Sequence, residues 1–175
     1  MNSRRIRPPS ACVFASLTLA ASGWLGCSPP IAVDSADSSA NAPSQGIELS
    51  VVDRAGYEAV VERLRGQVVL VDFWATWCLP CLEQLPHSVE LAEQEGKSGL
   101  AVVTVSLDDP EMLAPVRAAL ERVGASELTN LVSEYGGGSR SVEEFDVTGG
   151  ATPYYKLYDR SGKLRQTFGI DPAAE

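Results

Sequence analysis

Two cysteines, Cys78 and Cys81, are separated by two residues and follow a strand-like apolar run, 68–74. We expect a helix to begin at Cys78, because unpaired N–H groups and the positive dipole end of a helix stabilise a thiolate there. A thiol whose pKa is lowered in this way is a better nucleophile at neutral pH. Cys81, one turn further on, can attack a mixed disulfide formed on Cys78. The spacing therefore predicts thiol-disulfide exchange, with Cys78 attacking and Cys81 resolving.

Two other chemistries use cysteines at this spacing. A zinc site needs about two more ligands, and the chain from residue 47 onward offers His87 as its single histidine and no third cysteine. Carboxylates could complete such a site, so a non-catalytic module that binds a metal or a partner stays open as an alternative. Covalent haem attachment requires a histidine directly after the second cysteine, where this chain has Leu82. We expect no metal and no cofactor.

The first residues of the chain differ from the rest. Three arginines, at positions 4, 5 and 7, precede an apolar run of small residues, 11–21. This order is typical of a secretory signal peptide. The run is too short for a convincing membrane-spanning helix, although a retained anchor stays open.

Leu25-Gly26-Cys27 resembles a bacterial lipobox, in which the cysteine becomes the lipid-bearing first residue of the mature protein. We expect residues 1–27 to be a signal peptide with a lipobox, and the Ser-, Ala- and Pro-rich stretch 28–46 to be a flexible linker. The protein would then be exported to the bacterial periplasm or cell envelope. Acyl chains on Cys27 would hold it to a membrane surface without spanning the membrane.

Charge and cysteine count narrow the function further. Three of the 14 basic residues precede Cys27 and all 23 acidic residues follow it, so the remaining chain carries a formal charge of about −12. Nucleic acid is therefore excluded as a partner.

Within the expected domain, 47–175, Cys78 and Cys81 can pair only with each other. Their bridge would close too small a loop to stabilise the fold, which favours a redox function.

Hydrophobic periodicity predicts the elements that position the cysteines. Strands are expected at 47–52, 68–74, 100–107, 154–159 and 164–169. Helices are expected at 57–64, 78–94, 112–123 and 139–145. Strands and helices that alternate before a final hairpin predict an α/β fold with a mixed central sheet and helices on both faces.

Several residues predict local features of these elements. Pro86 should kink the helix that begins at Cys78. Gly124 should end the helix before it, and Ser139 or Ser141 should cap the short helix that follows. The stretch 126–134 has no clear pattern and receives no assignment.

The chain resembles the thioredoxin superfamily, and most closely its exported TlpA/ResA-type branch. Residues 71–81 follow the family pattern around the redox pair, and Thr152-Pro153 matches its cis-proline loop. The segment 108–135 resembles the extra region of the exported branch, and the resemblance covers about 47–170. It implies a thioredoxin fold and an extracytoplasmic enzyme that reduces protein disulfides. A disulfide oxidase or isomerase is the alternative.

The resemblance also implies roles for residues around the cysteines. Asp72, a carboxylate within an apolar strand, must be protonated, hydrated or paired. Its family counterpart accepts a proton from the resolving thiol through water, which here is Cys81. Thr152 and Pro153 are expected to contact the substrate.

Two aromatic or cyclic side chains next to the cysteines complete the expected site. Trp77 precedes Cys78 and Pro80 lies between the cysteines, so both are expected to offer an apolar surface to the substrate protein. Trp74 is expected to be core, and His87 a solvated residue without a role. The expected partners are protein disulfides and a membrane thiol that donates electrons to a monomeric enzyme.

The chain departs from the family pattern in three ways. Gln84 stands where the exported branch often has glutamate, and Glu83 is turned by about 100° around the helix. The dipeptide between the cysteines, Leu79-Pro80, matches neither reducing nor strongly oxidising relatives. Only residues 171–175 follow the segment that resembles the family, so we expect the closing helix of the family to be missing or truncated.

Overall fold

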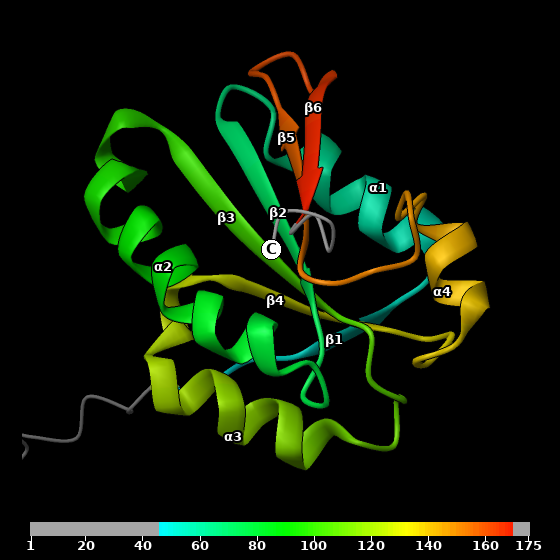
Figure 1. The fold of residues 1–175 in the computed structure, drawn as a ribbon. Coiled ribbons are helices and arrows are strands. Elements are labelled where there is room, and N and C mark those ends of the chain that lie inside the picture. Colours follow the sequence, from blue (N-terminus) through cyan, green and yellow to red (C-terminus); the bar gives the residue numbers. More distant parts are fainter. Residues whose placement is uncertain (1–45, 170–175) are drawn as a thin grey trace, which may run out of the picture. The chain divides into compact units, whose positions relative to one another are not determined.

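The computed structural model describes residues 46–169 (Figure 1). The predicted signal peptide, Cys27 and nearly all of the predicted linker lie outside the described residues, as do residues 170–175, where the closing helix would begin. Within 46–169, no helix is both long enough and apolar enough to cross a membrane.

A single mixed sheet forms the centre of the domain. Its strands lie in the order β1-β4-β3-β2-β5-β6. The first four of these run parallel, whereas β5 pairs antiparallel with both β2 and β6. The strands are β1 (Ser50–Val52), β2 (Val68–Trp74), β3 (Leu100–Ser106), β4 (Thr129–Ser133), β5 (Tyr154–Tyr158) and β6 (Leu164–Gly169).

Helices cover both faces of this sheet (Figure 1). Leu70 and Trp74 of β2 pack in one core cluster with side chains of α2 and α3. Val71 and Phe73, which point to the other face, pack in a second cluster with α1 and the end of α4. The helices are α1 (Arg54–Arg63), α2 (Leu79–Glu95), α3 (Leu113–Val123) and α4 (Ser139–Glu144), with short 3-10 turns at Gly96–Ser98 and Ala125–Glu127.

The predicted α/β class, the mixed sheet and the helices on both faces are confirmed. Gly124 ends α3 in a left-handed conformation, φ 75°, as predicted. Pro86 lies inside α2, and its kink stays a prediction. The predicted hairpin forms between β5 and β6.

The strand β4 is the element that periodicity did not predict. It contains Asn130, which is buried although it is polar. The Asn130 amide donates to the carbonyl oxygens of Ala125 (2.9 Å) and Leu128 (3.2 Å), and accepts from the Thr104 hydroxyl (2.9 Å). These bonds offset the desolvation cost of the amide, so a polar residue replaces part of the apolar pattern.

The predicted cap of α4 is wrong. Gly138 occupies the N-cap position, and no side chain caps the helix there. Ser141 instead lies buried, where its hydroxyl donates to the Gly136 carbonyl and bonds the hydroxyl of Ser133 (2.6 Å). A buried hydroxyl needs a partner, so Ser141 joins the helix to the end of β4 rather than to its own first turn.

Candidate active site

The two cysteines lie where the central strand β2 passes into α2. They form a disulfide with a Cα–Cα distance of 5.3 Å. Cys78 is the N-cap of α2, and its Sγ accepts a hydrogen bond from the backbone N–H of Cys81 (3.2 Å). The predicted helix start is thus confirmed. Cys78 is 7% exposed and Cys81 1%, so Cys78 is the cysteine that is more exposed to solvent.

The loop before Cys78 is held by the end of the neighbouring strand β3. The carboxylate of Asp108 accepts hydrogen bonds from the backbone N–H (2.9 Å) and hydroxyl (2.5 Å) of Thr76. A third bond comes from the hydroxyl of Ser106 (2.6 Å). Periodicity assigns Asp108 no role beyond ending a strand. The signal that points to it is an acidic residue two positions after the end of a parallel strand, because functional sites often lie at the C-terminal ends of such strands.

The predicted cis-proline loop also reaches the disulfide. The Thr152–Pro153 bond is cis, as expected. The carbonyl oxygen of Thr152 lies 3.4 Å from Sγ of Cys78. Thr152 is half-buried and Pro153 is buried. Residues 74 positions apart in the sequence therefore meet at one sulfur atom.

Apolar side chains surround Cys78 on the solvent side. Trp77 is 61% and Leu79 67% exposed, and Pro80 is exposed as well. The predicted apolar surface is therefore present, and it includes Leu79, which sequence reasoning did not assign to it. The loop after β4 approaches this surface, because a Cβ on Gly137 would lie 3.5 Å from Nε1 of Trp77. Trp74, in contrast, is buried core, as expected.

Asp72 lies deeper than the other predicted site residues. It is buried on the face of β2 that packs under α2. The Ser88 hydroxyl donates to its Oδ2 (2.6 Å), and its Oδ1 has no hydrogen-bond partner. Burial raises the pKa of Asp72 to about 6, while the bond from Ser88 acts in the opposite direction. No hydrogen bond joins Asp72 to either cysteine among the described contacts.

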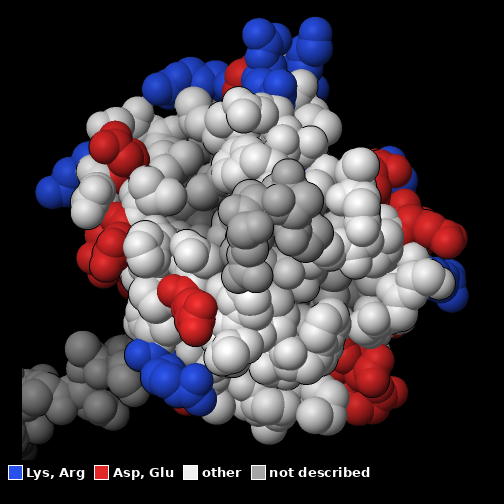
Figure 2. Space-filling model, viewed as in Figure 1, with Lys and Arg blue, Asp and Glu red and all other residues white. Residues whose placement is uncertain are grey.

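Other residues on α2 stay apart from this arrangement. Glu83 and His87 are exposed, and Gln84 is half-buried. Figure 2 shows that most of the described charged side chains on the face in view lie near the outline of the molecule. Within residues 46–169, no group of three or more His, Cys, Asp or Glu side chains is arranged to hold a metal ion.

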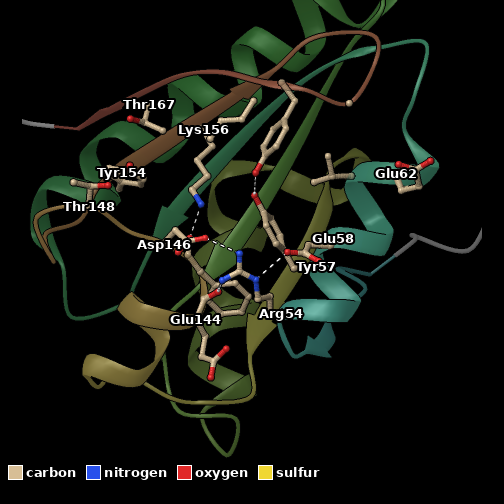
Figure 3. A pocket seen from close by; sticks show the side chains of 15 residues that line it. Arg54, Tyr57, Glu58, Glu62, Glu144, Asp146, Thr148, Tyr154, Lys156 and Thr167 are labelled. Carbon is tan, nitrogen blue, oxygen red and sulfur yellow. Dashed lines mark hydrogen bonds and ion pairs between the residues drawn. The ribbon is translucent and has the colours of Figure 1, made fainter.

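A cavity of about 410 Å³ lies on the opposite face of the sheet, between α1, α4 and β5 (Figure 3). Lys156 points into it, and its amine donates to the carbonyl oxygen of Phe145 (2.5 Å). Arg54 pairs with Asp146 (2.7 Å) and donates to the carbonyl of Glu144 (3.0 Å). Cations at the C-terminal end of a helix are stabilising. These contacts give the polar side chains of the cavity a structural role at the end of α4.

Known proteins with similar sequences include several thiol-disulfide oxidoreductases. The thiol-disulfide oxidoreductase ResA of Oceanobacillus iheyensis is 40% identical over 109 residues, which cover 62% of this chain and 42% of that protein. ResA of Geobacillus kaustophilus is 32% identical over 116 residues, which cover 66% of this chain and 62% of that protein. The chain therefore spans about half the length of these relatives.

Solved structures confirm the thioredoxin fold. A protein of Chlorobium tepidum, provisionally named a thiol:disulfide interchange protein DsbE, has a TM-score of 0.52 at 29% identity, over 63% of this chain and 74% of that one. A thiol-disulfide oxidoreductase from Bacteroides fragilis has a TM-score of 0.52 at 23% identity, over 65% of this chain and 80% of that one.

The model of the AhpC/TSA family matches residues 41–175, a range that contains the disulfide, Asp72 and the cis-proline loop. Because the match covers well over half of the chain, the protein belongs to the thioredoxin-like AhpC/TSA family.

Proposed function

We propose that the protein is an exported thiol-disulfide oxidoreductase that reduces protein disulfides. The observation that carries this proposal is the Cys78–Cys81 disulfide at the N-terminus of α2, with the Thr152 carbonyl 3.4 Å from the sulfur of Cys78. Helix N-termini stabilise thiolates, and a dithiol there can exchange with other disulfides. The names of the similar ResA proteins support the same activity.

In the reduced enzyme, the Cys78 thiolate attacks one sulfur of a substrate disulfide. A mixed disulfide forms, and the other substrate sulfur leaves as a thiolate that takes up a proton. Cys81 then gives its proton to Asp72 through water and attacks Sγ of Cys78. The second substrate thiolate leaves and takes up a proton. Two electrons have passed to the substrate, and the enzyme is left with the disulfide seen in the structure.

The assignment of Cys78 as the attacking residue rests on its position. It is the more exposed of the two cysteines, and its sulfur accepts the hydrogen bond from the N–H of Cys81 that would stabilise a thiolate. Cys81 is almost fully buried on the side of α2 that faces the sheet. It is therefore better placed to attack Cys78 than to attack another protein.

The substrate surface is the apolar rim around Cys78 together with the cis-proline loop. Trp77, Leu79 and Pro80 would cover apolar side chains of the substrate protein. The half-buried backbone of Thr152 would pair with an extended substrate segment next to Pro153.

The protein would work outside the cytoplasm. Residues 1–27 would direct export, a lipid on Cys27 would hold the protein at a membrane, and residues 28–46 would link it to the catalytic domain, 47–175. A membrane thiol would reduce the disulfide again after each turnover. We expect a monomer, which sedimentation of the purified protein would test.

Exchange of single cysteines tests the assigned roles. Cys81→Ser leaves the attacking thiol but removes the resolving one, so mixed disulfides with substrate proteins should accumulate. Cys78→Ser should trap few. Non-reducing gel electrophoresis after acid quenching of cells makes the comparison. Stronger trapping by Cys78→Ser would reverse the roles of the two cysteines.

The redox potential of the Cys78/Cys81 pair tests the direction of electron transfer. Equilibration of the purified protein with glutathione buffers should give a potential near about −270 mV, which is typical of reducing thioredoxins. A value near about −120 mV, typical of strong oxidants, would contradict the proposed reduction of substrates.

Asp72→Asn tests the burial of an ionisable carboxyl group. The pKa of Asp72 is about 6 in the folded protein and 3.8 without the fold. Between these values the folded state keeps a proton that the unfolded state has lost, so stability falls as the pH rises through this window. At pH 8 the ionised side chain of Asp72 lowers the free energy of unfolding by about 3 kcal/mol, because its pKa is raised by about 2 pH units and each unit corresponds to about 1.4 kcal/mol.

The neutral amide introduced by Asp72→Asn carries no such cost. The carboxyl group of the unfolded native protein is already more than half ionised at pH 4, so the free energy of unfolding of the variant, relative to the native protein, should rise by about 2 kcal/mol from pH 4 to pH 8. Urea unfolding of the oxidised proteins measures it. Glu90→Gln, an exposed change on α2, is the matched control. An equal difference at both pH values would show that Asp72 titrates normally.

Cys27→Ala tests the lipid anchor. Without a cysteine to acylate, the protein should move from the membrane fraction to the soluble fraction of cells, and labelling with a radioactive fatty acid should be lost. Cys12→Ala, a change within the predicted signal peptide, should alter neither result. Unchanged membrane association of Cys27→Ala would point to a retained N-terminal anchor instead.

A further inference from the structure

Asp72 has two hydroxyl-bearing neighbours within the sheet. Its register partners are Thr104 on β3 and Tyr155 on β5. Side chains at paired positions of adjacent strands point to the same face. The Thr104 hydroxyl, however, donates to Asn130 (2.9 Å), and no hydrogen bond joins Tyr155 to Asp72 among the described contacts. Neither of these two neighbouring hydroxyl groups therefore forms a hydrogen bond with Asp72 among the described contacts.

The partner of Asp72 comes from α2. Ser88 is 2% exposed, and its hydroxyl donates to Oδ2 of Asp72 at 2.6 Å. Oδ1 is equally buried and has no hydrogen-bond partner. The two carboxyl oxygens of Asp72 are therefore not equivalent, because Oδ2 accepts a hydrogen bond and Oδ1 does not.

Ser88, the partner of Asp72, lies on the same helix as the cysteine pair. It follows Cys81 by seven residues, which is nearly two full turns, so both side chains lie on the same face of α2. The helix rise separates their Cα atoms by about 10 Å along the axis. Asp72, which is bonded to Ser88, thus lies under the face of α2 that carries Cys81.

We propose that Ser88 is a positioning residue of the redox site, whose hydroxyl holds Oδ2 of Asp72 and leaves Oδ1 to take the proton of the Cys81 thiol through a bridging water. This proposal rests on the proposed function, in which Asp72 is the base of the resolving step. The proton leaves the Cys81 sulfur, binds Oδ1 and later returns to solvent or to the departing substrate thiolate. No electron moves in this transfer.

Ser88 is important because Asp72 has no cation to stabilise its ionised form. None of the ion pairs among residues 46–169 includes Asp72. Tyr155 on β5 and Cys81 on α2 are titratable groups on the same side of the sheet, and burial together with the negative charge of Asp72 raises the pKa of Tyr155. Among residues 46–169, the hydrogen bond from Ser88 is the one favourable polar contact of the carboxylate, and it opposes the effect of burial.

Ser88→Ala therefore should shift the titration of Asp72 upward. A hydrogen bond to a charged group contributes about 1.5–3 kcal/mol, which corresponds to an upward shift of about 1–2 pH units. Infrared titration of the oxidised protein measures this directly, and the Asp72 band is identified by its loss in Asp72→Asn. Ser88→Thr keeps a hydroxyl and should restore most of the native value.

Thr104→Val is the matched control. It removes another buried hydroxyl next to Asp72, but one that bonds Asn130 instead. It should lower stability and leave the Asp72 titration unchanged. An equal shift in Ser88→Ala and Thr104→Val, or no shift in either, would overturn the proposal, since a general loosening of the core would then account for the data.

A kinetic measurement separates the resolving step from the first attack. When reduced protein is mixed with a chromogenic aryl disulfide in a stopped-flow instrument, the first thiol released reports attack by Cys78, and the second reports resolution by Cys81. In Ser88→Ala, the pH inflection of the second phase should move upward with the infrared value, while the first phase stays unchanged.

The outcomes distinguish this inference from the proposed function. If the native protein releases neither thiol, the proposed function fails, whereas the infrared comparison still tests the bond between Ser88 and Asp72. The Asp72 pKa from infrared titration could shift in Ser88→Ala while the pH inflection of the second kinetic phase follows that pKa in no variant. Asp72 would then not be the base, and Ser88 would have no positioning role. A parallel shift of both phases would overturn the proposal as well.

Discussion

The burial of β2 on both faces is the constraint on which the remaining structure depends. Val68–Trp74 lies between β3 and β5, with one core cluster above it and the other below. A strand in this position cannot shift by one residue without exchanging its two faces. Its end, where the cysteines begin, is therefore fixed in space. Thr76, Cys78 and the cis-proline loop are all placed relative to that end.

The parts of the site that are local in sequence could be predicted. The cysteine spacing, the apolar run before it and the start of a helix at Cys78 are encoded within about fifteen residues, 68–82. The cis bond before Pro153 could be expected only through the family resemblance. The structure confirms the cis bond, and the loop that carries it meets Cys78 in the folded chain.

The parts that could not be predicted depend on contacts between distant elements. Asp108 and Ser88 are ordinary residues in the sequence, and each acquires its importance from a partner 32 or 16 positions away. The strand β4 was missed for the same reason. Its Asn130 is compatible with the core only because Thr104, Ala125 and Leu128 satisfy its amide. Hydrophobic periodicity contains no information about such pairings.

The hydrogen bonds of Asp108 to Thr76 imply that the reactivity of Cys78 is a property of the folded domain and not of the cysteine motif. In the folded domain the β2–α2 loop is held by Asp108, which follows β3, so the position of the loop depends on the pairing of β3 with β2. An unfolded chain therefore presents two ordinary thiols, without a helix terminus or a cis-proline loop beside them. Under the proposed export, the chain would cross a membrane before it folds, and the ordinary reactivity of its thiols until folding would protect newly exported chains from premature disulfide exchange with one another.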